Sequence, residues 1–334
     1  MTRCLLIITI LLSTLSCNGG DQLHGYLEDY QARMANVLAA DTVKTPSVSL
    51  AKFPSLAEMN HQEAEQSIKL FEFYQLKHCA LYTLIAERNT SLGRLQLPST
   101  RYLYERKLLI ALTDCIKQTS ESALKENLQQ WYALKSQNLG ASWASLMQFS
   151  SEIKRAFSSN FGSIDGSKDD GLVQTKQALE YLVKINKNEQ PNGTELEKHL
   201  KVLNDNFLPA KLWFSQLLLT EHLNKTTLWL TENTADLTCS QGSSKEKAEY
   251  LRNVFQLFFI EKIQPLAGQI NHYHYQLSPI FEKIAQHPDL SFAYKQYIQT
   301  QDQQGFAKYQ KAMQQHITFW QDFFKRCNFS PQKT

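Results

Sequence analysis

The chain has 334 residues with a formal net charge of +3, and 43% of them are hydrophobic, including 18 Phe, 14 Tyr and 5 Trp. This aromatic content can fill a sizeable core, which excludes an intrinsically disordered chain. Lys and Arg are scattered among acidic residues without forming a basic stripe, so we expect no nucleic-acid partner.

The first element is an uncharged run from Cys4 to Leu15, which follows one Arg and ends just before Cys17. Such a run is typical of a secretory signal, and it is shorter than the roughly 20 apolar residues that a transmembrane helix needs. We therefore expect residues 1–16 to be a cleaved signal peptide and residues 17–334 to form a helical periplasmic domain. No later stretch is that long without charge, so we expect no transmembrane helix in the mature chain.

Cys17 has two interpretations. It either follows an ordinary cleavage site and later joins a disulfide, or it ends a bacterial lipobox and receives a diacylglyceryl group. The stretch 13–17, STLSC, resembles a lipobox, although Thr14 stands where Leu is commoner. Lipidation removes Cys17 from an otherwise odd set of cysteines and leaves four that can all pair, so we favour the lipid. Its acyl chains would attach the protein stably to a membrane.

The residue after Cys17 is Asn18 rather than Asp. In the bacterial lipoproteins that this start resembles, Asp at that position is the usual signal for retention in the inner membrane. We therefore expect the protein to lie in the cell envelope on the outer membrane, facing the periplasm.

The remaining chain carries apolar residues at helical spacing, and no stretch shows the alternation that is typical of a strand. A first helix has one apolar face, formed by Leu23, Leu27, Tyr30 and Met34. Further helices are expected at about 60–89, 99–116, 120–137, 140–159, 172–185, 194–204, 209–232, 245–263, 265–276, 289–300 and 305–326. The sequence thus predicts an all-α multi-helix bundle. Its clearest internal loop, the Gly-rich segment 161–171, is a candidate subdomain seam.

The four cysteines of the helical region can pair in three ways. Cys79 and Cys115 fall in consecutive helices at depths that differ by roughly 9 Å, an offset that the connection between antiparallel helices can absorb. Cys239 and Cys327 each follow the end of a predicted helix. We therefore favour the pairs 79–115 and 239–327, each stabilising the fold by roughly 4 kcal/mol on a chain-entropy model. The alternative is that all four are buried free thiols.

The densest polar group is the segment 85–105, IAERNTSLGRLQLPSTRYLYE. In a binding interpretation, Arg88 or Arg94 presents its guanidinium to an anionic ligand or to a carboxylate of a partner. In a structural interpretation, which we favour, the charges form a salt-bridged turn in which Arg88 pairs with Glu105. The candidate binding residues are Glu87, Arg88, Asn89, Arg94, Tyr104 and Glu105.

Several of these residues also carry a family resemblance. The AERN-S-LGR segment, Tyr104-Glu105 and the two cysteines around them resemble an uncharacterised bacterial lipoprotein family, domain of unknown function 3080. The sequence YLRNVF at 250–255, with Gln-Pro at 264–265, is similar to the C-terminal half of that family. The resemblance covers nearly the whole mature chain. It implies a gammaproteobacterial envelope protein with an N-terminal lipid and no established activity.

Metal and catalytic signals are weak. His272 and His274 point about 200° apart on a helix, and Glu195 with His199 lacks the further ligands of a zinc site, so we expect no metal and no cofactor. The sequence has no G-x-S-x-G and no phosphate loop. One buried Glu could still serve a helical glycosidase, and the candidates are Glu72, Glu87 and Glu261, the last among apolar neighbours that would raise its pKa.

The aromatic segments 210–219 and 316–324 are expected to be core, the alternative being a groove for an acyl chain or a partner helix. The sequence therefore favours a lipid-anchored protein that acts by binding, as a scaffold or accessory factor for an envelope protein. A carrier or sensor of a small apolar or anionic ligand is the alternative. An envelope enzyme acting on peptidoglycan or lipid is less expected.

Overall fold

The computed structural model describes residues 21–44, 47–59, 70–94, 96–159, 161–166, 169–186, 192–239 and 242–329. The expected signal peptide and Cys17 lie outside the described residues, as do the side chains of Leu70, Leu92 and Arg94. Within the described ranges every regular element is a helix, which confirms the predicted all-α multi-helix fold. None of the described helices combines the length and the apolar character needed to cross a bilayer.

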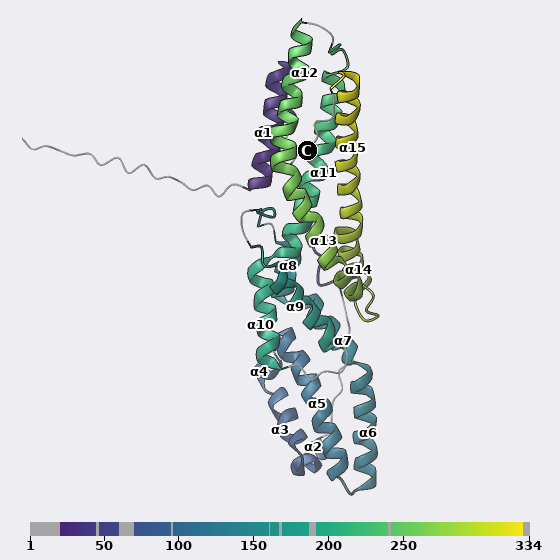
Figure 1. Ribbon diagram of the computed structural model, residues 1–334. Helices are drawn as coiled ribbons and strands as arrows, with labels where there is room; N and C mark the ends of the chain where they lie inside the picture. The colour runs from purple at the N-terminus through teal and green to yellow at the C-terminus, as the bar shows by residue number, and fades with distance from the viewer. Residues whose placement is uncertain are drawn as a thin grey trace, which may run out of the picture.

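Figure 1 shows an elongated molecule, with α1, α11, α12 and α15 at one end and α2, α3, α5 and α6 at the other. The first half of the chain forms α1 (Gln22–Leu38), α2 (Leu70–Gln75), α3 (Ala80–Arg88), α4 (Ser91–Arg94), α5 (Pro98–Gln118), α6 (Ser122–Gln137), α7 (Leu139–Phe149) and α8 (Ser151–Ser158). The second half forms α9 (Leu172–Ile185), α10 (Gly193–Asn206), α11 (Leu208–Asn233), α12 (Gly242–Val254), α13 (Gln264–Ala285), α14 (Phe292–Gln299) and α15 (Gly305–Arg326).

The main hydrophobic core runs through the upper and middle parts of the molecule. It joins α1, α7 to α11 and α12 to α15, and the large rings of Trp143, Trp213 and Trp320 are buried in it. Full burial of one such side chain stabilises the fold by roughly 2–3 kcal/mol. The prediction that segments 210–219 and 316–324 contribute to the core is confirmed.

A smaller core lies at the opposite end of the molecule and packs α3, α5 and α6 together. Its buried members are Leu76, Cys79, Leu81, Leu108, Leu112, Cys115, Leu124 and Leu128. The main core takes residues from both sides of loop 161–171. The predicted seam at that loop therefore does not coincide with the division between the two cores.

Two disulfides form, and they are the pairs that the sequence predicts. Cys79–Cys115 links the start of α3 to α5 across the small core, with Cα atoms 5.4 Å apart. Cys239–Cys327 holds the residues after α15 against the segment after α11, with Cα atoms 5.1 Å apart.

Two predicted helices are interrupted. Residues 60–69 of the predicted helix 60–89 lie outside the described residues; in the remainder, α2 passes into a short 3₁₀ turn, η1 (Leu76–His78), and Cys79 is extended, with φ −115° and ψ 152°. The predicted helix 140–159 breaks at Ser150, whose hydroxyl accepts a hydrogen bond from the Ile153 amide and begins α8. Serine competes for backbone donors in this way and so favours a helix start over a helix interior.

Conversely, two predicted helices are joined. The segments predicted at 245–263 and 265–276 form one continuous run in which α12 leads through the π-helical segment η2 (Phe255–Ile263) into α13. Pro265 has no amide hydrogen, and its ring would crowd the carbonyl one turn earlier. The wider π-helical turns just before it accommodate that ring without ending the helix. The run then continues past residue 276 because Leu277 and Phe281 extend its buried stripe.

Candidate functional site

The predicted polar turn lies where α3 ends and α5 begins. The Thr90 hydroxyl donates to the carbonyl of Glu87 at 2.8 Å and accepts the Gly93 amide at 3.0 Å. The Arg88 guanidinium donates to the carbonyl of Gly93. A Cβ on Gly93 would clash with the carbonyls of Glu87 and Arg88, so only glycine allows this close approach. Arg88 therefore helps to close the turn.

Glu105 of α5 is the centre of a second set of contacts. Its carboxylate is buried and lies 2.9 Å from Arg101 Nη2 and 3.0 Å from Lys135 Nζ of α6. The predicted pairing of Glu105 with Arg88 is wrong. Arg101 lies one turn earlier on the same helical face and within direct reach of Glu105, while Arg88 is bonded to the turn backbone.

The other predicted residues divide by exposure. Tyr104 packs against the small core, and burial, reinforced by the neighbouring Glu105 carboxylate, raises its pKa to about 12. Glu87 and Asn89 are exposed, while the side chain of Arg94 lies outside the described part of the chain. The fold therefore gathers these residues around one turn. Of those whose contacts are described, Arg88 closes the turn and Glu105 holds α5 to α6, and the outer surface of the turn carries Glu87, Asn89 and the exposed Leu97.

Two of the three glutamates suggested as a general acid lack the expected burial. Glu87 is exposed, and Glu261 lies on the solvent side of η2 in spite of its apolar neighbours in sequence, while Glu72 is half-buried on α2. His272 is exposed and His274 buried, on opposite faces of α13 as expected from their spacing. Among described residues, three metal-type donors come together at His78, Cys79 and Cys115, and both sulfurs there are used in the disulfide.

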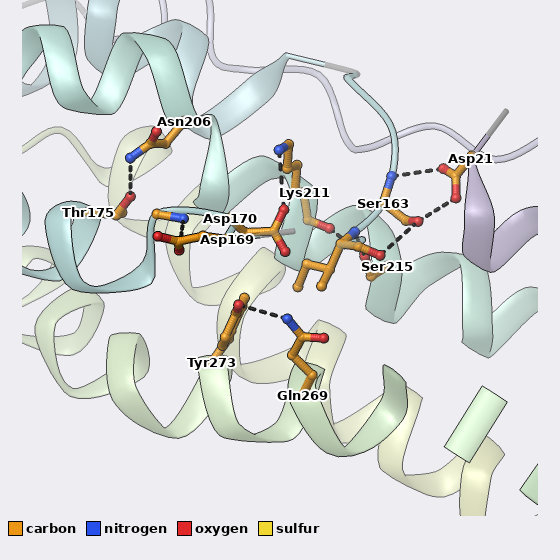
Figure 2. Close-up of polar contacts among 12 residues, drawn as sticks. Asp21, Ser163, Asp169, Asp170, Thr175, Asn206, Lys211, Ser215, Gln269 and Tyr273 are labelled. Carbon is orange, nitrogen blue, oxygen red and sulfur yellow. Dashed lines mark hydrogen bonds and ion pairs between the residues drawn. The ribbon is translucent and has the colours of Figure 1, made fainter. Parts of the chain in front are cut away.

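A junction that sequence reasoning missed lies where the described chain begins (Figure 2). The carboxylate of Asp21 caps α1 by accepting the His24 amide at 3.2 Å. It also accepts the Ser163 amide at 2.8 Å and the Ser163 hydroxyl. The start of α1 is thereby fixed to the loop 161–166, which lies 142 residues further along the chain.

The same loop is held on α11. The Ile164 amide donates to the Ser215 hydroxyl at 2.9 Å, and that hydroxyl donates in turn to the Lys211 carbonyl at 2.7 Å. Asp170 is buried beside Lys211, with Nζ and Oδ1 3.4 Å apart. Burial raises the pKa of Asp170, and the Lys211 ammonium offsets part of that effect.

The junction continues to the surface of α13. The Tyr273 hydroxyl accepts a hydrogen bond from Gln269 at 2.8 Å. Burial raises the pKa of Tyr273, and the Asp170 and Asp169 carboxylates add to this (Figure 2). The Gly, Asp and Ser content of 161–171 signals a turn. The spacing of residues within this segment gives no indication that it contacts α1, α11 and α13.

Comparison with known proteins assigns the family. The model of a protein family of unknown function, DUF3080, matches residues 27–331, and the chain belongs to this family. Searches of curated proteins and of solved structures gave no match. The predicted family is thus confirmed, while the lipid and the gammaproteobacterial envelope remain predictions.

Proposed function

We propose that this chain is a lipid-anchored protein of the bacterial cell envelope that acts by binding, as a scaffold or accessory factor for another envelope protein. The supporting observation is the fixed position of Asp21 on the body of the protein, only four residues after Cys17. A tether of that length spans about 14 Å at most. A lipid on Cys17 would therefore hold the folded body against the membrane.

Two buried ionisable side chains are held in structural contacts, which favours binding over catalysis at these positions. Both ring nitrogens of His316 are in hydrogen bonds inside the main core, and Glu105 is in ion pairs with Arg101 and Lys135. The turn at 87–105 instead offers a protein partner a surface with exposed Glu87, Asn89 and Leu97.

The ligand-carrier alternative receives less support. A groove of about 400 Å³ between α11 and α15 is open to solvent, and its lining is uncharged: Asn224, Thr227, Leu228, Thr231, Gln314, Gln315 and Thr318. Such a lining offers neither a cation for an anionic ligand nor an enclosed apolar wall for an acyl chain. Native mass spectrometry of the purified protein tests this alternative, since a carrier would retain a small molecule.

The partner proposal is tested by photocrosslinking in living cells. A photoreactive amino acid replaces Leu97 at the turn, and the matched control replaces Leu228 at the far end of the molecule, because the two leucines are 63% and 62% exposed. We expect one recurring envelope protein to be captured from position 97 and not from 228, and the reciprocal experiment from that protein to return this chain. Equal or absent capture at both positions would overturn the proposed binding surface.

The anchor is tested separately by replacing Cys17. The unchanged chain, expressed in a gammaproteobacterium supplied with labelled palmitate, should incorporate the label, and the Cys17→Ser variant should not. Equal labelling of the two chains, or none in the unchanged chain, would contradict a lipid on this residue.

A further inference from the structure

An aromatic pair, with Phe161 exposed and Phe207 half-buried, lies next to Asp21, the first described residue. Ser163 holds Asp21, and Phe161 is two residues before Ser163, within about 7 Å along the backbone. Asp21, the other partner in this contact, is only four residues after Cys17 in the sequence. If Cys17 carries a lipid, as proposed above, the membrane surface must pass close to Phe161.

The ring of Phe161 is 52% exposed and is stacked on the ring of Phe207. The two ring centroids are 4.1 Å apart, and the ring planes meet at 26°. The Arg155 guanidinium lies 5.4 Å from the centroid of Phe207. Phe side chains combined with Lys and Arg are typical of helices that lie in the membrane interface.

Phe207 is held in an unusual backbone conformation. It joins α10 to α11 with φ 51° and ψ 21°, the left-handed region in which helices commonly end on glycine. A bulky side chain is strained there, and a residue kept in such a conformation points to a local role. Here the role of the side chain is to support the exposed ring of Phe161.

Charged side chains flank the aromatic pair. Lys154 and Arg155 are exposed on α8, and the Asp205 carboxylate is bound by Lys201 Nζ at 2.5 Å. That hydrogen bond lowers the pKa of Asp205, and the Arg155 guanidinium adds a smaller effect. Three cationic side chains thus stand against one carboxylate, so this surface would attract anionic headgroups while the Phe161 ring inserts among them.

We propose that the Phe161–Phe207 pair, with Arg155 beside it, is the surface through which this protein rests on phospholipid headgroups. The proposal rests on the proposed lipid at Cys17, since the acyl chains bring this surface to the bilayer. Together the lipid and the aromatic pair would fix the orientation of the elongated body on the membrane, and so determine which face is turned toward a partner.

The test uses the full chain purified from membranes and placed in vesicles of phosphatidylethanolamine and phosphatidylglycerol. The photoreactive analogue p-benzoylphenylalanine replaces Phe161 in one sample and Phe292 in the matched control. Phe292 is 78% exposed and is the first residue of α14. After irradiation, mass spectrometry reads both the adduct at each position and the acyl mass on Cys17 in the same molecules.

We expect phospholipid adducts at position 161 in several-fold excess over position 292, together with an acylated Cys17. An acylated Cys17 with equal or absent phospholipid adducts at 161 would overturn this inference and leave the proposed function standing. A protein adduct at 161 in cells, in place of a phospholipid adduct, would also overturn it. A Cys17 without acyl mass would overturn both.

Two further variants test whether contact with phospholipid depends on the aromatic rings of this surface. Made in the chain that carries p-benzoylphenylalanine at position 161, Arg155→Gln removes the neighbouring charge and leaves the aromatic side chain at 161, so we expect adducts there to persist. Phe207→Gly relieves the backbone strain but removes the supporting ring, so the adducts should fall toward the control level. Unchanged adducts after loss of the Phe207 ring would contradict a paired aromatic surface.

Discussion

His316 of α15 should make the stability of the main core depend on pH. Its side chain is fully buried, with Nε2 2.9 Å from the Tyr30 hydroxyl and Nδ1 2.8 Å from the Thr227 hydroxyl. Thr227 already donates to the Leu223 carbonyl, and Tyr30 accepts the indole hydrogen of Trp320. These directions assign the proton to Nδ1 and leave Nε2 as an acceptor, so the neutral ring satisfies every group.

A protonated ring would have no acceptor for its second hydrogen. Burial accordingly lowers the pKa of His316 to about 3, whereas an unfolded histidine has a pKa near 6.5. Because the unfolded state binds the proton first, the contribution of His316 to stability is complete above pH 6.5 and falls as the pH drops toward 3. Between pH 7 and pH 5 the loss from this residue amounts to about 2 kcal/mol.

The assay is urea unfolding at pH 7 and pH 5, followed by tryptophan fluorescence. His316→Gln lowers stability at both pH values, but the difference between them should shrink by about 2 kcal/mol relative to the unchanged chain. The control is His272→Gln, which alters an exposed histidine of α13 and should leave that difference unchanged. An equal pH difference in the unchanged chain and in the His316 variant would refute the buried neutral ring.

Three further changes test other parts of the fold. Glu105→Ala leaves Arg101 and Lys135 without their shared carboxylate and should cost about 3–5 kcal/mol in urea unfolding, so a loss below about 1 kcal/mol would contradict a buried ion pair. Gly171→Ala places a Cβ at φ 73° against an asparagine of α10 and should cost more than about 1 kcal/mol, and an unchanged melting temperature would contradict this. Cys327→Ser opens the C-terminal bridge and leaves Cys79–Cys115 intact, so it should cost about 4 kcal/mol in urea unfolding; a variant as stable as the unchanged chain would contradict a stabilising bridge.

Helical spacing was sufficient to predict the fold class, because apolar stripes such as those of α9 and α15 repeat within the segment itself. The bounds of α9, at 172–185, match the prediction, and so does the end of α15 at Arg326, although η3 (Thr300–Gln304) joins α14 to α15 without a break. The cysteine pairs could also be predicted. For Cys79 and Cys115, the position of each residue along its helix gives its distance along the bundle axis, and Cys239 and Cys327 each follow the end of a predicted helix. Both features depend on local periodicity and on simple geometry.

What the sequence did not predict depends on contacts between distant segments. The break at Cys79 and the restart after Ser150 depend on single backbone conformations within otherwise helical patterns. The contact of Asp21 with Ser163 joins residues that share no local pattern. Several basic residues lie near Glu105 in the sequence, so its ion-pair partner could not be chosen from the sequence. Lys135 becomes a partner because α6 packs against α5.

The central claim is that Cys17 anchors this body to a membrane. The most direct test is the mass of the N-terminal peptide of the protein purified from membranes of a gammaproteobacterial host. The account predicts that the mature chain begins at Cys17 and that this residue carries the mass of a diacylglyceryl group and its acyl chains. A chain that begins elsewhere, or a Cys17 that carries no lipid, would contradict the account.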